Sequence, residues 1–398
     1  MAEISGIYAR EILDARGVPA VEAEVELAAG TVGRASVPAL PFPECGEVRE
    51  RRDGDPARHD GCGVLAAVEN IEKILRPELV GMDVFDQIGI DRILTDTDGT
   101  PDRSNLGVNA LFAVSLACAH AACAELDLPL YRYLGGVNAK VLPVPLFTAS
   151  GGGPAGRFMI RPVGADCFAE ALKTASAVLR AFEKTADDRD GIPARLVSAV
   201  EKAGLVPGED VTIALDCAAN GLYRDGLYDA GSAGEPQNAR RSPEQRAAFL
   251  AGLVEKFPVD TLIDPMAAED RDGRRLLARA VGSKCRLVGN ELFRSDPDRL
   301  KEDLSSDTVD AIVIHPVRAG TVTGTLDLVE AARRKGLAVI IGSSPGETED
   351  CSAADLSVAV NAGSFEAGPL AGSENVGKLN QFLRIEEQLG LLARFGNP

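Results

Sequence analysis

The chain of 398 residues contains no tryptophan, and aromatic residues make up only 5% of it. So few rings leave little material for a surface on which nucleic-acid bases stack. Basic residues are also in deficit, because 42 lysines and arginines face 60 aspartates and glutamates, a net charge of −18. A phosphate backbone or an anionic membrane surface would repel such a chain. We therefore expect neither a nucleic acid nor a membrane among its partners.

Long apolar runs are missing as well. The most apolar helical stretch, residues 110–124, is short for a membrane span and contains Ser115 and His120. The N-terminal segment 1–17 carries charges where a secretory signal would have its apolar core. The eight cysteines have no framework spacing, which favours reduced thiols. These features predict a cytoplasmic location.

What the chain does contain is an ordinary 45% of hydrophobic residues, with enough length for two domains that need no disulfide or structural metal. The first forty residues alternate like a β-meander, with candidate strands at 4–13, 18–27 and 31–37. Helical patterns follow at 63–74, 85–94 and 105–125, and Ser104 is the candidate N-cap of the last. We predict an α+β domain over residues 1–135.

Residues 136–398 alternate short apolar runs with amphipathic helices, which is typical of a TIM-like barrel. The candidate strands are 143–147, 158–162, 211–216, 261–264, 286–290, 311–315, 338–342 and 365–367. The functional site of such a barrel lies at the C-terminal ends of its strands. Six polar residues stand there: Asp216, Asp264, Asn290, His315, Ser343 and Glu366. The alternative is that these side chains are merely solvated or hydrogen-bonded to loops.

Segments along nearly the whole chain, in order, resemble those of enolases. They include AREILDARGVPAVEAEVEL, GRASVP, DGTPDRSNLGVNA, FMIRPVGA, DVTIALDCAA, LVGNELF and KLNQFLRIEEQLG. The resemblance implies an α/β protein with an N-terminal α+β cap over 1–135 and a TIM-like (β/α)8 barrel over 136–398. It also implies the dehydration of 2-phosphoglycerate to phosphoenolpyruvate, with Mg²⁺ as cofactor.

The resemblance assigns roles to positions, and most of them carry other residues here. Of the three acidic ligands of the principal Mg²⁺, only Asp216 is kept, and the other two positions are Ile263 and Asn290. His315 stands where the family has its base lysine, and Glu366 where it has a second lysine. A relocated metal site would have to use neighbours such as Asp264 and Glu291, although strand alternation points neighbours to opposite faces.

The family's phosphate clamp and proton donor are also replaced. Ser343 and Ser344 occupy the clamp's His and Arg positions and are the candidate substrate-binding residues. The mobile loop that supplies a serine to a second Mg²⁺ reads ALPFPE at 39–44. Two segments are shortened: one ends at Arg157, in a Glu position, and the other, between 187 and 193, lacks the proton-donating Glu.

Base, acid, metal ligands and phosphate clamp are thus lost together, and each contributes a large factor in rate. We expect a pseudoenzyme with a binding or regulatory role, weak or absent Mg²⁺ binding, and a small anionic metabolite as ligand. The alternative is a diverged lyase or transferase that acts on a related phospho- or phosphono-carboxylate.

Four charges of the family's dimer interface remain. Arg10 and Glu22 match the strand residues that pair across the enolase interface with a Glu and an Arg of the R-I-E-E motif, here Glu387 and Arg384. The resemblance therefore implies a homodimer, and the alternative is that these are solvated surface charges.

Overall fold

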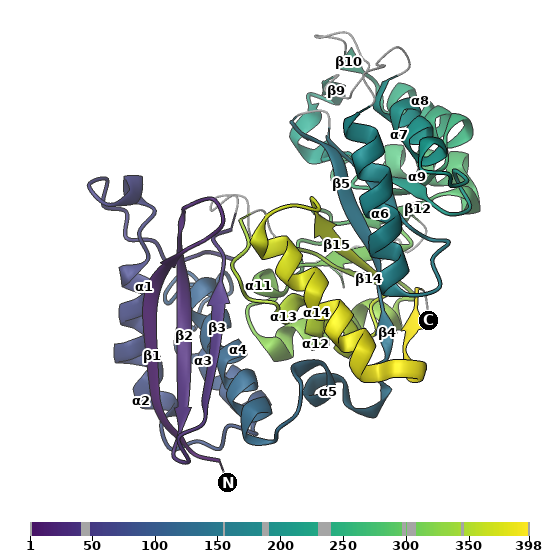
Figure 1. Ribbon diagram of the computed structural model, residues 1–398. Helices are drawn as coiled ribbons and strands as arrows, with labels where there is room; N and C mark the ends of the chain where they lie inside the picture. Colours follow the sequence, from purple (N-terminus) through teal and green to yellow (C-terminus); the bar gives the residue numbers. More distant parts are fainter. Residues whose placement is uncertain are drawn as a thin grey trace.

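The computed structural model describes residues 2–40, 48–153, 156–184, 191–229, 240–296, 300, 308–343 and 346–396. Figure 1 shows the N-terminal cap, in purple and blue, beside a barrel that runs from teal to yellow.

The cap is built on the predicted meander. Its strands β1 (Ile4–Leu13), β2 (Pro19–Leu27) and β3 (Val32–Val37) form an antiparallel sheet in that order. Helices α1 (Leu65–Asn70), α2 (Arg76–Leu79), α3 (Gln87–Asp98) and α4 (Val108–Glu125) accompany it, with the π-helical turn η2 (Ile71–Leu75) between the first two. Helix α4 packs against β2 and β3.

Helix α4 begins later than the sequence predicted. Gly107, with φ of 98°, is its N-cap, so the expectation that Ser104 caps the helix is wrong. Instead, the backbone N–H of Ser104 donates to the Thr100 hydroxyl and the Asp102 carboxylate in the preceding turn. Among the described residues, Val108–Leu126 is the one helix long and apolar enough to cross a membrane, and 83% of that window is buried inside the protein. Its apolar surface is therefore accounted for by packing in the core.

All eight predicted barrel strands are present and close into one barrel, in the order β11-β12-β13-β14-β15-β5-β6-β7. Their bounds are β5 Val144–Gly153, β6 Gly156–Arg161, β7 Thr212–Asp216, β11 Val259–Ile263, β12 Arg286–Gly289, β13 Ala311–Ile314, β14 Ala338–Ile341 and β15 Ser364–Gly368. The barrel interior is an apolar plug of Leu146, Met159, Ala214, Ile263, Val288, Ala311, Val313 and Ile340. The interior below the mouth is thus filled by side chains.

Helices cover the outside of the barrel. Their bounds are α5 Leu130–Gly135, α6 Phe168–Glu183, α7 Gly191–Lys202, α8 Pro243–Lys256, α9 Arg271–Val281, α11 Pro316–Ala319, α12 Val322–Arg334, α13 Ser352–Ala359 and α14 Ser373–Leu389. Short strands add two small sheets: β8 Tyr223–Arg224, β9 Leu227–Asp229 and β10 Arg240–Arg241 form one, and β4 Val141–Leu142 pairs with β16 Arg394–Phe395.

One barrel strand departs from a regular βα repeat. Strand β6 follows β5 through a hairpin and runs antiparallel to both β5 and β7. The N-terminal end of β6 therefore lies at the mouth, where the other strands have their C-terminal ends. The register pairs Arg157 with Asp216. Gly156 has φ of 79°, and a Cβ there would lie 2.1 Å from the Asp216 carbonyl oxygen, so this close approach requires glycine.

A buried polar cluster joins the cap to the barrel. The Ser115 hydroxyl of α4 donates to Asp91 of α3 at 2.6 Å and accepts the backbone N–H of Val322 at 2.9 Å. The other Asp91 oxygen accepts the backbone N–H of Thr323 at 2.8 Å. Since these two N–H groups open α12, the cluster caps a barrel helix with residues of the cap.

The contact between β3 and α4 leaves no room at Gly33. A Cβ there would lie 2.1 Å from the Ala121 nitrogen and 2.3 Å from the Ala117 oxygen. We predict that Gly33→Ala lowers the free energy of unfolding of the cap by about 1–3 kcal/mol, because backbone must move. Urea unfolding measures this. Gly252→Ala in α8, where a Cβ meets nothing within 4 Å, is the control and should be neutral or stabilising. Equal effects of both substitutions would contradict the packing argument.

Candidate functional site

The barrel mouth gathers the predicted residues and adds an arginine to them. Asp216 ends β7, Glu366 lies in β15, and Arg157 projects from the start of β6. The Arg157 guanidinium contacts Asp216 Oδ2 through Nη2 at 2.7 Å and through Nε at 3.1 Å. The same Nη2 lies 3.5 Å from Glu366 Oε1. One guanidinium therefore neutralises much of the negative charge of two carboxylates.

Burial makes this ion pair strong and the second carboxylate easy to protonate. The side chains of Asp216 and Glu366 are 11% and 3% exposed. The pKa of Glu366 is raised to about 7, mainly by burial and also by the charge of Asp216, against the lowering effects of Arg157 and Arg318. Burial lowers the pKa of Arg157, but the charges of Glu366 and Asp216 outweigh it and raise that pKa overall. Arg157 is accordingly a permanent cation at the mouth.

The carboxylate of Asp264 is hydrogen-bonded to backbone N–H groups. Its two carboxylate oxygens accept the N–H groups of Asn290 and Glu291 at 2.9 and 2.8 Å. Its own φ is 42°, an uncommon conformation for a non-glycine residue. Burial and the nearby Asp216 raise the pKa of Asp264 to about 7. Asp264 thus fixes the turn after β12.

His315 follows β13 and is buried. Its Nε2 lies 3.2 Å from Asn290 Oδ1, while its Nδ1 has no hydrogen-bond partner in the described part of the chain. Burial, together with the positive charges of Arg318 and Arg157, holds its pKa well below its usual range. The imidazole is therefore neutral at physiological pH and cannot supply the positive charge of a lysine.

A second set of arginines neutralises Glu291. Arg318 Nη1 lies 3.0 Å from Glu291 Oε1, and Arg294 Nε lies 3.5 Å from Oε2. Like Asp216, this carboxylate is held by guanidinium groups of the same chain.

The predicted substrate-binding serines are only partly described. The Ser343 hydroxyl donates to the backbone carbonyl of Glu366 at 2.7 Å. Ser344 lies outside the described residues. Ser343 therefore links two neighbouring strand ends.

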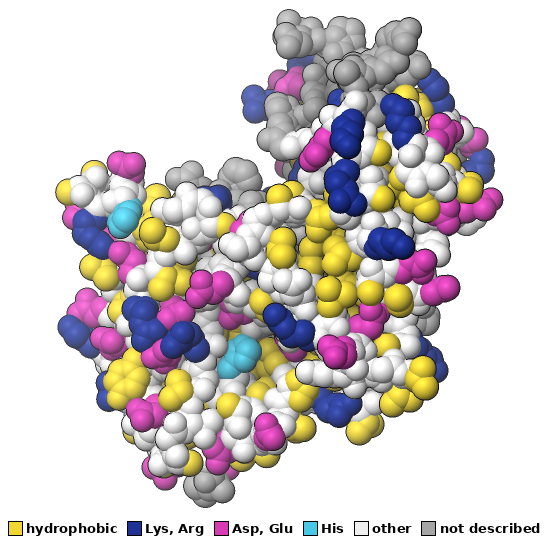
Figure 2. All heavy atoms as spheres, viewed as in Figure 1, with side chains coloured by type: hydrophobic (Ala, Val, Ile, Leu, Met, Phe, Trp, Pro, Cys, Tyr) yellow, Lys and Arg dark blue, Asp and Glu magenta, His cyan; other side chains and the backbone are white. Residues whose placement is uncertain are grey.

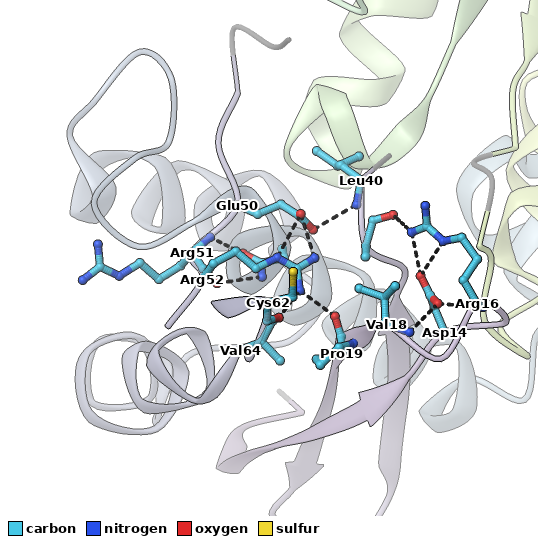
Figure 3. A network of polar contacts seen from close by, with 12 residues as sticks. Asp14, Arg16, Val18, Pro19, Leu40, Glu50, Arg51, Arg52, Cys62 and Val64 are labelled. Carbon is cyan, nitrogen blue, oxygen red and sulfur yellow. Dashed lines mark hydrogen bonds and ion pairs between the residues drawn. The ribbon is translucent and has the colours of Figure 1, made fainter. Parts of the chain in front are cut away.

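The start of the loop at 39–44 is tied to the cap, as Figure 3 shows. Arg16 donates to the Ala39 carbonyl at 2.7 Å and pairs with Asp14. The Leu40 N–H donates to Glu50 Oε1 at 3.1 Å, and Glu50 pairs with Arg52 at 2.8 Å. Residues 41–44 lie outside the described part. Ala39 and Leu40 are buried, so the start of this loop is anchored.

These contacts do not fit a divalent cation. Asp216 is paired with Arg157, Glu291 with Arg318, and Asp264 is capped by backbone N–H groups. Within the described residues, no group of three or more His, Cys, Asp or Glu side chains is placed to hold a metal. Mg²⁺ needs several charged or carbonyl oxygens in octahedral geometry. The described residues of the mouth do not supply this set of ligands.

The four predicted interface residues lie on two surfaces. On the outer face of the cap sheet, Arg10 pairs with Glu22 and, at 2.6 Å, with Glu24 of its own chain. Figure 2 shows basic and acidic side chains intermixed on this face. Arg384 and Glu387 are exposed on α14.

Sequence reasoning did not nominate Arg157, Arg294 or Arg318 as site residues. It treated every barrel strand as parallel and looked for the site at the C-terminal end of each strand. For the strand predicted at 158–162, that end is Pro162 and not Arg157. The short Gly-rich link between residues 151 and 156 was the available signal of a hairpin.

Two family models match the chain. The model described as Enolase, N-terminal domain, matches residues 4–134, and the model described as Enolase, C-terminal TIM barrel domain, matches residues 193–397. Proteins with these domains generally bind Mg²⁺. The stretch between the two matches contains β5 and β6, and with them Arg157.

The buried carboxyl of Glu366 predicts a pH-dependent contribution to stability. Its pKa rises from an ordinary 4.5 to about 7 in the folded protein. Folding therefore favours the protonated form, and the stabilisation present below pH 4.5 is lost as the pH rises to about 7. Relative to Glu366→Gln, the wild type should lose up to about 3 kcal/mol of unfolding free energy between pH 5 and pH 8. Urea unfolding at both pH values tests this, with the exposed Glu209→Gln as control. A pH-independent difference for Glu366→Gln would refute the assignment.

Proposed function

The chain belongs to the enolase family, and we propose that it has lost the family's dehydration of 2-phosphoglycerate and serves a binding or regulatory role. The observation that carries this proposal is the contact of Arg157 with Asp216 at 2.7 Å. It places a covalently attached cation on the one metal-ligand position that keeps its acid.

Electrostatics support the loss of the reaction. Removing an α-proton next to a carboxylate creates a dianion, which needs concentrated positive charge. The positive charge of Arg157 is already compensated by Asp216 and Glu366, and His315 is uncharged. A general base or acid contributes roughly 10²–10⁴ in rate, and an oxyanion stabiliser roughly 10²–10³. When the base, the acid and the stabilising groups are replaced together, nothing is left to stabilise the dianionic intermediate.

One observation favours a second candidate, a diverged lyase or transferase on a related phospho- or phosphono-carboxylate. His315 Nδ1 and Glu366 Oε2 are buried without a hydrogen-bond partner among the described residues. Buried polar atoms left unpaired are costly and mark places where a ligand or water binds. A neutral imidazole and a carboxyl with a pKa of about 7 could serve as base and acid. It ranks second because Arg157, the guanidinium in contact with Glu366, is already paired with Asp216.

We predict no conversion of 2-phosphoglycerate to phosphoenolpyruvate, even at high protein concentration with excess Mg²⁺. The reason is that His315 and Glu366 stand at the positions of the family's two lysines, so neither position can provide the positive charge of a lysine to the reaction. Product absorbance measures the reaction. Turnover that disappears in His315→Ala would contradict the proposal, because it would show that the family's reaction is retained. Turnover unchanged in that variant would identify a contaminating enolase.

We also propose a homodimer in which the cap sheet of one subunit meets α14 of the other. Arg10 is 44% exposed on its side chain and can pair across an interface as well as within its own chain. Arg384 and Glu387 are three residues apart on α14 and hence on one face. A two-fold axis would repeat each Arg–Glu contact. Because exposed ion pairs contribute about 0–1 kcal/mol, they would set the register of the interface more than its affinity.

Arg384→Glu should weaken this dimer about tenfold or less, since it replaces an attraction with a repulsion at two symmetric places. Analytical ultracentrifugation over a dilution series measures the dissociation constant. Arg279→Glu, the same charge change at an exposed position of α9, is the matched control and should leave it unchanged. A monomeric wild type at micromolar concentration would refute the homodimer.

A further inference from the structure

A large cleft lies between the cap and the barrel, to the side of the mouth. Its volume is about 740 Å³, within the range of roughly 300–1,000 Å³ that is usual for small-molecule sites. On the cap side it is lined by α3 and the turn at 101–103, and on the barrel side by 294–296, Arg318 and the start of α12. It adjoins the mouth, because Ser295 in its wall accepts the backbone N–H of His315 at 3.0 Å.

Four arginines line this cleft: Arg92, Arg103, Arg294 and Arg318. Arg92 pairs with Asp96 of its own helix at 3.4 Å, and the other three come from separate segments. Arg294 and Arg318 share the single carboxylate of Glu291, so one of their two positive charges is left over. Arg103 donates to the Thr100 carbonyl at 3.2 Å and pairs with no carboxylate among the described residues. The three side chains thus provide about two positive charges beyond those paired with carboxylates.

The acidic residues of the cleft are mostly paired. Asp91 accepts hydrogen bonds from Ser115 and Thr323, and Asp102 lies 3.1 Å from Arg49. Asp296 and Asp327 also line the cleft. They balance the surplus of the arginines, so the cleft carries no net negative charge in a chain whose overall charge is −18. An anion therefore meets less repulsion here than the net charge of the chain would suggest.

Two of these arginines and one neighbouring serine have unusual backbone conformations. Arg103, Arg294 and Ser295 have φ of 58°, 50° and 56°, a region that non-glycine residues rarely adopt. Arg294 Nε is buried and makes no hydrogen bond within the described residues, although Glu291 lies 3.5 Å away. Strained backbone and an unused buried donor occur together where a ligand is expected to complete the contacts.

We propose that this cleft binds a small ligand through its phosphate or carboxylate group, held between Arg103 of the cap and Arg294 and Arg318 of the barrel. The planar guanidinium has a fork of donors that matches both kinds of oxyanion. Thr321 and Thr323 also line the cleft. The proposal stands whether or not the barrel mouth is catalytic, because it uses none of the mouth's carboxylates.

The test is calorimetric titration of the full-length protein with two probes, inorganic phosphate and succinate. We expect one site per chain for at least one probe. Arg103→Gln should weaken it about tenfold or more, since a charge-assisted hydrogen bond is lost. Arg103 makes no ion pair in the described structure, so this variant should fold, which thermal unfolding verifies. Arg275→Gln, an exposed arginine of α9, is the matched control and should bind as the wild type does.

The outcomes separate the alternatives. Tighter binding of phosphate assigns a phosphorylated ligand, and tighter binding of succinate a carboxylate one; both support the cleft. Binding of neither probe would overturn the proposal, as would equal weakening by Arg103→Gln and Arg275→Gln. Binding that Arg157→Gln abolishes and Arg103→Gln leaves intact would place the anion at the barrel mouth and would also overturn it.

Discussion

The ion pair between Arg157 and Asp216 determines what the barrel mouth can do. It exists because β6 runs antiparallel to its neighbours, which brings the first residues of this strand to the end where the other strands finish. Gly156 permits the close approach, since any side chain there would meet the Asp216 carbonyl. We propose that this fixed cation from the chain itself takes the place of the exchangeable metal ion of the family site.

The other acidic residues near the mouth are also paired with groups of the same chain. Glu291 is held by Arg318 and Arg294, and Asp264 by two backbone N–H groups. Taking such charges out of water costs several kcal/mol each, which only close partners offset. A mouth with these charges paired internally does not need a metal to offset them. We propose that the same pairing accounts for the loss of the reaction, because Arg157 is already engaged by Asp216 and Glu366.

Much of the fold could be predicted from the sequence, because the meander and all eight barrel strands have clear apolar periods. The reversed direction of β6 could not, since a period of two is the same in either direction. For the same reason the sequence predicts Asp216 and His315 at the mouth but not Arg157, which contacts Asp216. The predicted start of α4 was wrong because a serine hydroxyl is a common N-cap, and Ser104 was therefore chosen. In the structure, α4 begins after Gly107. Charge pairing between distant segments, such as Arg318 with Glu291, has no local sequence signal.

The central claim is that Arg157 takes the place of the metal, and Mg²⁺ titration tests it most directly. Calorimetry on the wild type should detect no site tighter than about millimolar, because one acidic ligand already paired with a guanidinium cannot hold the ion. Arg157→Gln frees Asp216 and Glu366 and should bind Mg²⁺ more tightly than the wild type does. A micromolar site in the wild type would show that the cage has been rebuilt and would contradict the account.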